Sequence, residues 1–239
     1  MENNDIFKSE KRESTVDYVI NTIKKLLLTK KLKPGDILPS EAVLSDSLKV
    51  SRGSIREAMK ILSAFGVVEI KRGDGTYICD SFNKSFIDPF LFNLILSGPD
   101  TAEIVELREL LECQVVTLVI KNALEQDIED LEQVHLEMKH LFKKTAGSEA
   151  KGLIAYELKF HEALGRATKN VLVEKIYSFV MELFVPYIEK TYDYEKNGTN
   201  TILLHEGIVK SIKARDINKA VEATQKSIEE WRLLFDENH

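Results

Sequence analysis

The sequence predicts a mostly α-helical protein: an N-terminal winged helix-turn-helix followed by a C-terminal all-α antiparallel helical bundle. Residues 33–77 have the pattern of two short helices, a tight turn and a two-stranded hairpin. Beyond residue 100, apolar residues recur at spacings of three and four, with no convincing strand. The expected divisions are a disordered N-terminus at 1–12, the winged helix-turn-helix at 13–80, a linker with the first bundle helix at 81–98, and the helical domain at 99–239.

The first helices of the N-terminal domain are defined by apolar spacing and by capping residues. An amphipathic helix is expected at about Ser14–Lys30, and Pro34-Gly35 then indicates a turn. Ser40 precedes Glu41 and can N-cap the next helix, because its hydroxyl accepts a backbone N–H while the acid favours the positive helix end. Lys49-Val50 is expected to end that helix.

The following helix, from Arg52 to about Ala64 with Ser51 as its N-cap, has two different faces. The inward face is apolar, with Ile55, Ala58, Met59 and Leu62. The outward face carries Arg52, Arg56 and Lys60, which are four residues apart and form one basic stripe. Gly53 on that face leaves room for close approach of a ligand.

A two-stranded hairpin is expected after Gly66, with strands at Val67–Ile70 and Thr76–Ile78. Its tip carries Lys71 and Arg72 beside a glycine turn. A recognition helix enters the major groove by its N-terminal end, and arginine can bind guanine O6 and N7 with two hydrogen bonds. Taken alone, the basic stripe could be an ordinary solvent-exposed charged face. Together with the two capped helices, the tight turn and the basic hairpin tip, it predicts binding to double-stranded DNA.

Charge is distributed unevenly along the chain. The chain has 33 Lys+Arg and 39 Asp+Glu. Residues 1–80 contain 14 of the basic and 12 of the acidic residues, and the remainder contains 19 basic and 27 acidic residues. A charge of +2 on the first third and −8 on the rest fits a DNA-binding module joined to a domain with another task. The polar N-terminus, the absence of a long apolar run and two distant cysteines predict a cytoplasmic protein without a membrane partner.

The helical domain contains inward-facing polar residues. Glu157 and His161 share a face at i, i+4, and His205 shares its face with apolar residues. A carboxylate and two imidazoles suit a divalent metal, whereas the alternative is that they are satisfied core residues. His135 and His140 each follow a Glu-x-x-His pattern, but both lie on one helix and are interpreted as surface or boundary residues.

The stretch PGDILPSEAVLSDSLKVSRGSIREAMKILSAFGVVEIKRGDGTYI resembles the DNA-binding domain of the GntR family of bacterial transcription regulators. Ala42 differs from the basic residue that is frequent there in related proteins. The resemblance places DNA contacts on Ser51, Arg52, Gly53, Arg56, Arg72 and Gly73, and the helix N-cap Ser40 and the stripe residue Lys60 complete the expected set.

Three stretches of the helical half resemble the FCD-type effector domain of the FadR subgroup of that family. They are LRELLE at 107–112, YELKFHEALGRATKN at 156–170 and HEGIVKSIKARDINKA at 205–220. Many FCD domains bind a metal through an Asp and three His, whose positions fall here on Glu157, His161, His205 and Ser227. The resemblance therefore implies one divalent metal (Zn, Ni or Mn), although Glu replaces Asp and Ser227 replaces the third His. It also implies a small carboxylate effector, facing Arg108 and Ser227; the alternative for Arg108 is a surface ion pair with Glu112.

These observations predict a homodimeric transcription regulator, of the repressor type, that binds a palindromic operator and responds to a small-molecule effector. Two alternatives stay open at this point. One is a metal-free regulator that senses a bulkier apolar or acyl ligand. The other is a metal-dependent enzyme domain fused to a DNA-binding head, although nothing in the sequence indicates a catalytic residue.

Overall fold

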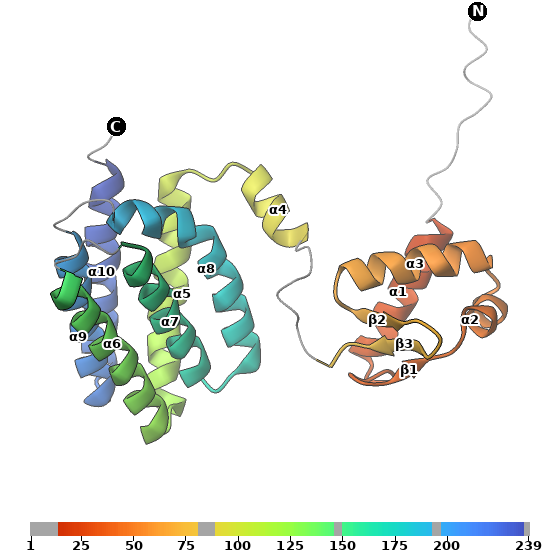
Figure 1. Ribbon diagram of the computed structural model, residues 1–239, viewed down its shortest axis with the longest axis horizontal. Helices are drawn as coiled ribbons and strands as arrows, with labels where there is room; N and C mark the ends of the chain where they lie inside the picture. Colours follow the sequence, from red (N-terminus) through yellow and green to blue (C-terminus); the bar gives the residue numbers. More distant parts are fainter. Residues whose placement is uncertain (1–13, 81–88, 146–149, 193–196, 237–239) are drawn as a thin grey trace, which may run out of the picture. The chain divides into compact units, whose positions relative to one another are not determined.

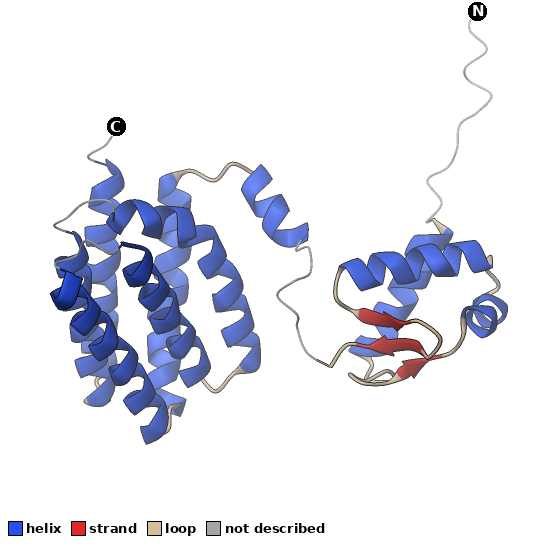
Figure 2. Ribbon diagram, in the orientation of Figure 1, coloured by secondary structure: helices blue, strands red, loops and turns tan. Residues whose placement is uncertain are grey.

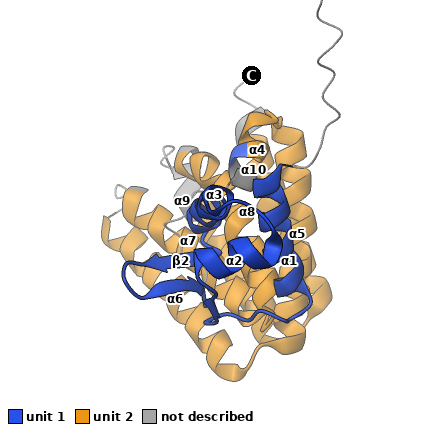
Figure 3. Cartoon of the chain, turned by 90° about the vertical axis from the view of Figure 1, so that its right-hand side faces the viewer, with its two compact units in different colours: residues 1–92 blue, residues 93–239 orange. Residues whose placement is uncertain are grey.

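The computed structural model describes residues 14–80, 89–145, 150–192 and 197–236, which fall into two compact units (Figure 1). The first unit comprises residues 1–92 and the second residues 93–239 (Figure 3). The N-terminal segment expected to be disordered lies outside the described residues.

The first unit is a three-helix domain with a small sheet (Figure 2). Its elements are α1 (Thr15–Leu28), β1 (Ile37–Leu38), α2 (Glu41–Leu48), α3 (Arg52–Ala64), β2 (Val68–Lys71) and β3 (Gly75–Ile78). The strands are antiparallel in the order β1-β3-β2, and β1 had not been predicted. It is only two residues long, which is too short for an alternating pattern to reveal it.

Local side-chain chemistry explains where α2 and α3 begin. The Ser40 hydroxyl accepts a hydrogen bond from the Val43 N–H, and the Ser51 hydroxyl accepts one from the Ser54 N–H. Lys49 ends α2 in the left-handed conformation, with φ 56°. These features produce the tight turn that joins the two helices.

The core of the first unit forms where the apolar face of α3 meets α1 and the sheet. Its buried members are Val19, Ile23, Leu38, Ile55, Ala58, Met59, Leu62, Val68 and Ile78. Because this face of α3 is buried, the opposite face is exposed and presents the basic stripe to solvent.

The second unit is an all-α bundle, as predicted (Figure 2). Its helices are α5 (Thr101–Asn122), α6 (Glu125–Thr145), α7 (Ala150–Ala167), α8 (Val171–Tyr192), α9 (Asn197–Lys213) and α10 (Ile217–Asp236), and α4 (Pro89–Leu96) spans the division between the units. Asp100 caps α5, because its side chain and that of Glu103 form a capping box.

The bundle packs α5 against α10, α10 against α9, α9 against α6, α6 against α7 and α7 against α8. Large core side chains include Leu131, Phe160, Tyr177, Phe184 and Ile212. This arrangement turns the inward faces of α5, α7, α9 and α10 toward one interior. Within the described part of the chain, no helix is both long and apolar enough to cross a membrane.

Candidate functional site

The predicted DNA contacts of α3 lie on one exposed surface. Ser51, Arg52, Gly53 and Lys60 are all exposed, as is the α2 N-cap Ser40. A Cβ atom added at Gly53 would meet only the Ser51 hydroxyl, at 3.6 Å, so the fold itself does not require glycine there. The start of α3 is therefore open to a bulky partner.

Arg56 on the same face is held by an acid from α2. Its Nε lies 3.3 Å and 3.2 Å from the two Glu41 carboxylate oxygens, and its Nη2 lies 2.7 Å from Glu41 Oε2. The hydrogen bond from Arg56 lowers the pKa of Glu41 below its ordinary value. Both groups are therefore charged near neutral pH, and Arg56 is fixed in one orientation.

The tip of the β2–β3 hairpin carries the two predicted wing residues. Arg72 is exposed, and Gly73 has φ +78°, a backbone conformation that favours glycine. The Lys71 ammonium lies 4.7 Å from the centre of the Tyr77 ring. The hairpin thus presents basic groups at a tight turn.

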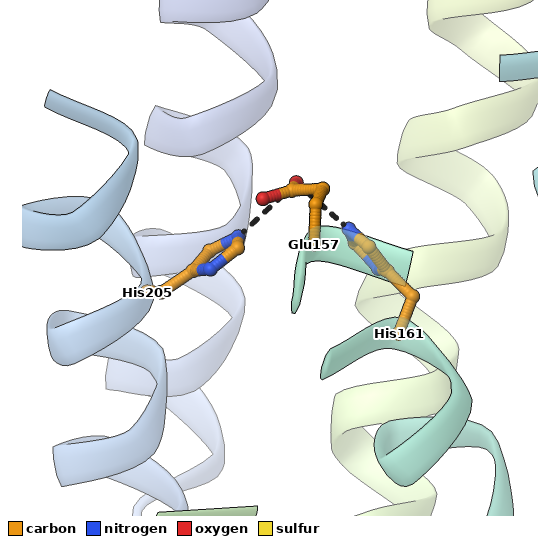
Figure 4. Close-up of side chains that lie close together, drawn as sticks. All are labelled: Glu157, His161 and His205. Atoms are coloured by element: carbon orange, nitrogen blue, oxygen red, sulfur yellow. Dashed lines mark hydrogen bonds and ion pairs between the residues drawn. The ribbon is translucent and has the colours of Figure 1, made fainter. Parts of the chain in front are cut away.

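In the second unit, Glu157, His161 and His205 meet in the interior although they come from two different helices (Figure 4). Glu157 Oε1 lies 3.2 Å from His161 Nε2 and 3.4 Å from His205 Nε2. The three side chains are buried, and one ligand atom from each lies within 4.8 Å of the others. Burial raises the pKa of Glu157, but the charge and hydrogen bonds of the two histidines outweigh this and hold it well below its ordinary value.

Two aromatic side chains fix the orientation of the histidines. The Tyr177 hydroxyl on α8 lies 2.6 Å from His161 Nδ1. Phe160 stacks on the His205 ring, with centroids 4.1 Å apart and planes 11° apart. When the Tyr177 O–H donates to His161 Nδ1, His161 Nε2–H donates to Glu157. When His161 Nδ1–H donates to Tyr177 instead, Nε2 presents the lone pair that a metal ligand needs.

This donor set fits a divalent transition metal. Donors at about 2.0–2.2 Å from one tetrahedral ion lie about 3.3–3.6 Å apart. The two separations measured from Glu157 are already close to this range. A carboxylate with two imidazoles also matches the ligand types of three-ligand zinc sites that leave one position for another molecule.

Arg108 on α5 lies inside the bundle, so the surface ion pair considered for it is wrong. Arg108 and Glu112 are 2 % and 3 % exposed, and Arg108 Nε donates to Glu112 Oε1 at 2.8 Å. The guanidinium carbon lies 4.7 Å from the Trp231 ring centre and 5.8 Å from that of Phe184. Arg108 Nη1 is buried and has no hydrogen-bond partner within the described part of the chain.

Arg108 and Glu112 belong to the same buried polar cluster as Glu157, His161 and His205. Glu112 Oε1 lies 3.8 Å from His161 Nδ1. Burial lowers the pKa of Arg108, but Glu112 and Glu157 outweigh this and raise it. Ser227 is buried on α10 at 8 % exposure, one turn before Trp231.

His135 was wrongly interpreted as a surface or boundary residue. It is 4 % exposed on the inward face of α6, and neither ring nitrogen has a hydrogen-bond partner among the residues that the structure describes. His140 is exposed. The sequence did contain the signal for His135, because Ile128, Leu131, His135 and Met138 follow the alternating spacing of three and four that marks the buried face.

Sequence reasoning did not select Tyr177 or Trp231 for the site. Tyr177 shares its face with the buried residues Val180, Phe184 and Ile188, so its burial was accessible from spacing. Its contact with His161 was not, because that contact depends on how α8 is rotated against α7.

Comparison with known proteins identifies both parts of the chain. Residues 15–78 match the model of "Bacterial regulatory proteins, gntR family", and residues 103–230 match that of the FCD domain. The HTH-type transcriptional regulator LutR of Bacillus subtilis is 32% identical over 67% of this chain and 71% of its own length. The Uxu operon transcriptional regulator of Escherichia coli is 28% identical over 81% of this chain and 70% of its own.

The fold is also found in a solved structure. A GntR protein of Streptococcus agalactiae superposes with a TM-score of 0.65 at 23% identity, over 91% of this chain and 98% of that one. The two family models and the two curated relatives named above describe transcription regulators and not enzymes. The chain belongs to the GntR family, with an FCD domain as its C-terminal unit, and is a DNA-binding transcription regulator.

Proposed function

We propose that a homodimer of this chain represses transcription in the cytoplasm by binding a palindromic operator, and releases it when a small carboxylate enters the FCD domain. The observation that supports a carboxylate effector is Arg108 Nη1, beside the Glu157, His161 and His205 cluster. It is a buried cationic donor without a hydrogen-bond partner among the described residues. A carboxylate oxygen satisfies such a donor with a charge-assisted hydrogen bond.

Glu157, His161 and His205 would hold one divalent ion, Zn²⁺, Ni²⁺ or Mn²⁺. When bound, the ion supplies a positive charge and one coordination position for an effector oxygen. Ser227 adds no strong ligand, because a neutral hydroxyl binds such ions weakly. It instead provides a small buried polar side chain on α10, one turn before Trp231.

The charges of the cluster favour an anionic effector once the metal is bound. Arg108 is a buried base, and Glu112 and Glu157 are buried acids. With neutral imidazoles, the formal charges of this buried set sum to one net negative charge. A divalent ion changes this to one net positive charge. Buried charge without compensation is costly, so a singly charged carboxylate completes the balance.

Regulation requires that the effector bind the operator-free state more tightly than the operator-bound state. The difference between these affinities equals the coupling free energy, which is typically about 1–3 kcal/mol. On the operator, two recognition helices α3 would enter successive major grooves of two half-sites.

A panel of small carboxylates, tested by thermal unfolding of Zn²⁺-loaded protein, examines this function. A ligand at one hundred times its Kd adds about 2.7 kcal/mol, which raises the unfolding temperature by about 5–10 °C. Arg108→Lys keeps a charge beside Glu112 but loses the guanidinium fork, so the shift should be lost. Arg166→Lys, on the exposed ion pair with Glu162, is the matched control and should keep the shift.

The same ligand must weaken operator binding of the unaltered protein. If apolar or acyl ligands stabilise the protein and Arg108→Lys does not change their effect, the carboxylate class is wrong. The rings of Trp231 and Phe184, which lie beside Arg108, would then be the main contacts of the effector.

A further inference from the structure

We infer that Glu41 is a positioning residue that determines how Arg56 reads DNA, by holding one edge of the guanidinium and leaving the other edge for a base. The inference rests on the proposed contact between Arg56 and the major groove. It adds a specificity-determining role for an acid on a helix other than α3.

Glu41 is placed for this role by the start of α2. It is the first residue of that helix, directly after the N-cap Ser40. Arg56 lies just over one turn into α3, and α2 packs against α3. The two side chains meet with three nitrogen–oxygen contacts of 2.7 to 3.3 Å while remaining accessible, at 63% exposure for Arg56 and 39% for Glu41.

The contacts use only part of the guanidinium. Nε–H and one Nη2–H point to the Glu41 carboxylate. A guanidinium has five N–H donors, so both Nη1–H groups and the second Nη2–H remain. Those form the end-on fork, which matches the paired acceptors O6 and N7 of guanine. Glu41 and a guanine can therefore be bound to Arg56 at the same time.

The pair also changes what Arg56 prefers to bind. A free guanidinium is attracted to any phosphate, and this attraction does not depend on sequence. The Glu41 carboxylate cancels most of that charge locally, while the remaining N–H donors still recognise a base edge. Arg52, four residues earlier on the same face, also lowers the pKa of Glu41, so the acid remains charged between two arginines.

The test compares Glu41→Gln with the unaltered full-length protein on two DNA duplexes. One duplex is selected by the unaltered protein from a randomised pool, and the other is a shuffled duplex of the same composition. Fluorescence anisotropy at several salt concentrations gives both affinities and their salt dependence. Asp46→Asn is the matched control, because it removes an exposed acid that pairs with Lys49 on the same helix.

Glu41→Gln should bind the shuffled duplex several-fold more tightly and the selected duplex no more tightly. The ratio of the two affinities should fall about tenfold, and the slope of log affinity against log salt should steepen by about 1. Asp46→Asn should leave the ratio unchanged. Circular dichroism of both variants should show an unaltered fold, since both acids are at the surface.

Two results would overturn the inference. If Glu41→Gln and Asp46→Asn change the ratio and the slope equally, Glu41 contributes only general charge. If Glu41→Gln weakens binding to the selected duplex without strengthening binding to the shuffled one, Glu41 contacts DNA itself. Arg56→Ala distinguishes both results from a failure of the proposed DNA contact. If Arg56 does not read a base, Arg56→Ala leaves the ratio of the two duplex affinities unchanged.

Discussion

At the scale of single residues, the buried polar side chains of the FCD domain are the least expected members of an apolar bundle. Removing a charge or an imidazole from water is costly unless partners compensate. Arg108, Glu112, Glu157 and His161 compensate one another through direct contacts. His135 does not have this compensation, because both its ring nitrogens are buried and neither has a hydrogen-bond partner in the described segments.

The state of His135 makes stability dependent on pH. Burial, followed by the charge of His205, lowers the pKa of His135 from 6.5 to about 4. Between these values the unfolded chain binds the proton and the folded chain does not, so stability falls as pH decreases from 6.5 to 4, by up to about 3 kcal/mol. Above pH 6.5 the group has no such effect.

His135→Leu should therefore flatten this part of the stability profile. Urea unfolding of chelator-treated protein at pH 7 and pH 4.5 measures it. The difference between the two pH values should shrink by about 2–3 kcal/mol relative to the unaltered protein. The exposed residue on the same helix provides the control His140→Leu, which should not alter the difference. An equal pH dependence in His135→Leu would show that His135 is protonated in the folded protein.

Tyr177 offers a second prediction at this scale. Its hydroxyl, 2.6 Å from His161 Nδ1, holds the ring with Nε2 toward Glu157, the orientation that a metal ligand needs. Tyr177→Phe keeps the ring in the core but removes that hydroxyl. Loss of such a supporting hydrogen bond typically weakens metal affinity 10–100-fold. Isothermal titration with Zn²⁺ measures the change, and an unaltered affinity would mean that Tyr177 does not position His161.

At the scale of elements, the sequence predicts helix bounds and inward faces, but not the contacts between side chains of different helices. The recognition helix was predicted with its observed bounds, because Ser51 and the apolar face identify it locally. Glu157, His161 and His205 were grouped because helix periodicity turns them inward. Their contacts with Tyr177 and Arg108 depend on the packing of other helices, which periodicity in one segment does not encode.

The start of α5 provides a prediction about a single helix. Asp100 accepts the Glu103 N–H at 2.8 Å, and Glu103 returns a contact to the Asp100 N–H at 3.0 Å. Asp100→Ala should lower the free energy of unfolding by about 1 kcal/mol, because it leaves a helix N–H without its acceptor. Urea unfolding measures this, with the exposed mid-helix substitution Glu106→Ala as the control. Equal effects of the two substitutions would show that the box contributes no stability.

At the scale of the whole molecule, operator binding is expected to require two copies of the chain. The basic surface of one DNA-binding unit is small, and a helix-turn-helix dimer gains affinity from two half-sites. The short helix α4 adds exposed apolar surface, with Phe92, Ile95 and Leu96 more than half exposed. Such surface is typical of an interface.

Removing one half-site from the selected duplex tests the dimer. Binding should weaken at least about tenfold, because the DNA-binding unit of the second chain then makes only non-specific contacts. Sedimentation of the complex should show two chains on the complete duplex. One chain per duplex, with full affinity for a single half-site, would contradict the dimer.

The central claim is that the buried Glu157, His161 and His205 cluster is a working metal site that controls effector binding. Elemental mass spectrometry of untagged protein, purified without chelator, tests it most directly. About one Zn²⁺, Ni²⁺ or Mn²⁺ per chain is predicted, lost in Glu157→Ala and in His161→Ala but kept in the exposed-residue control His140→Ala. No metal even after loading, or an equal content in all variants, would contradict the claim.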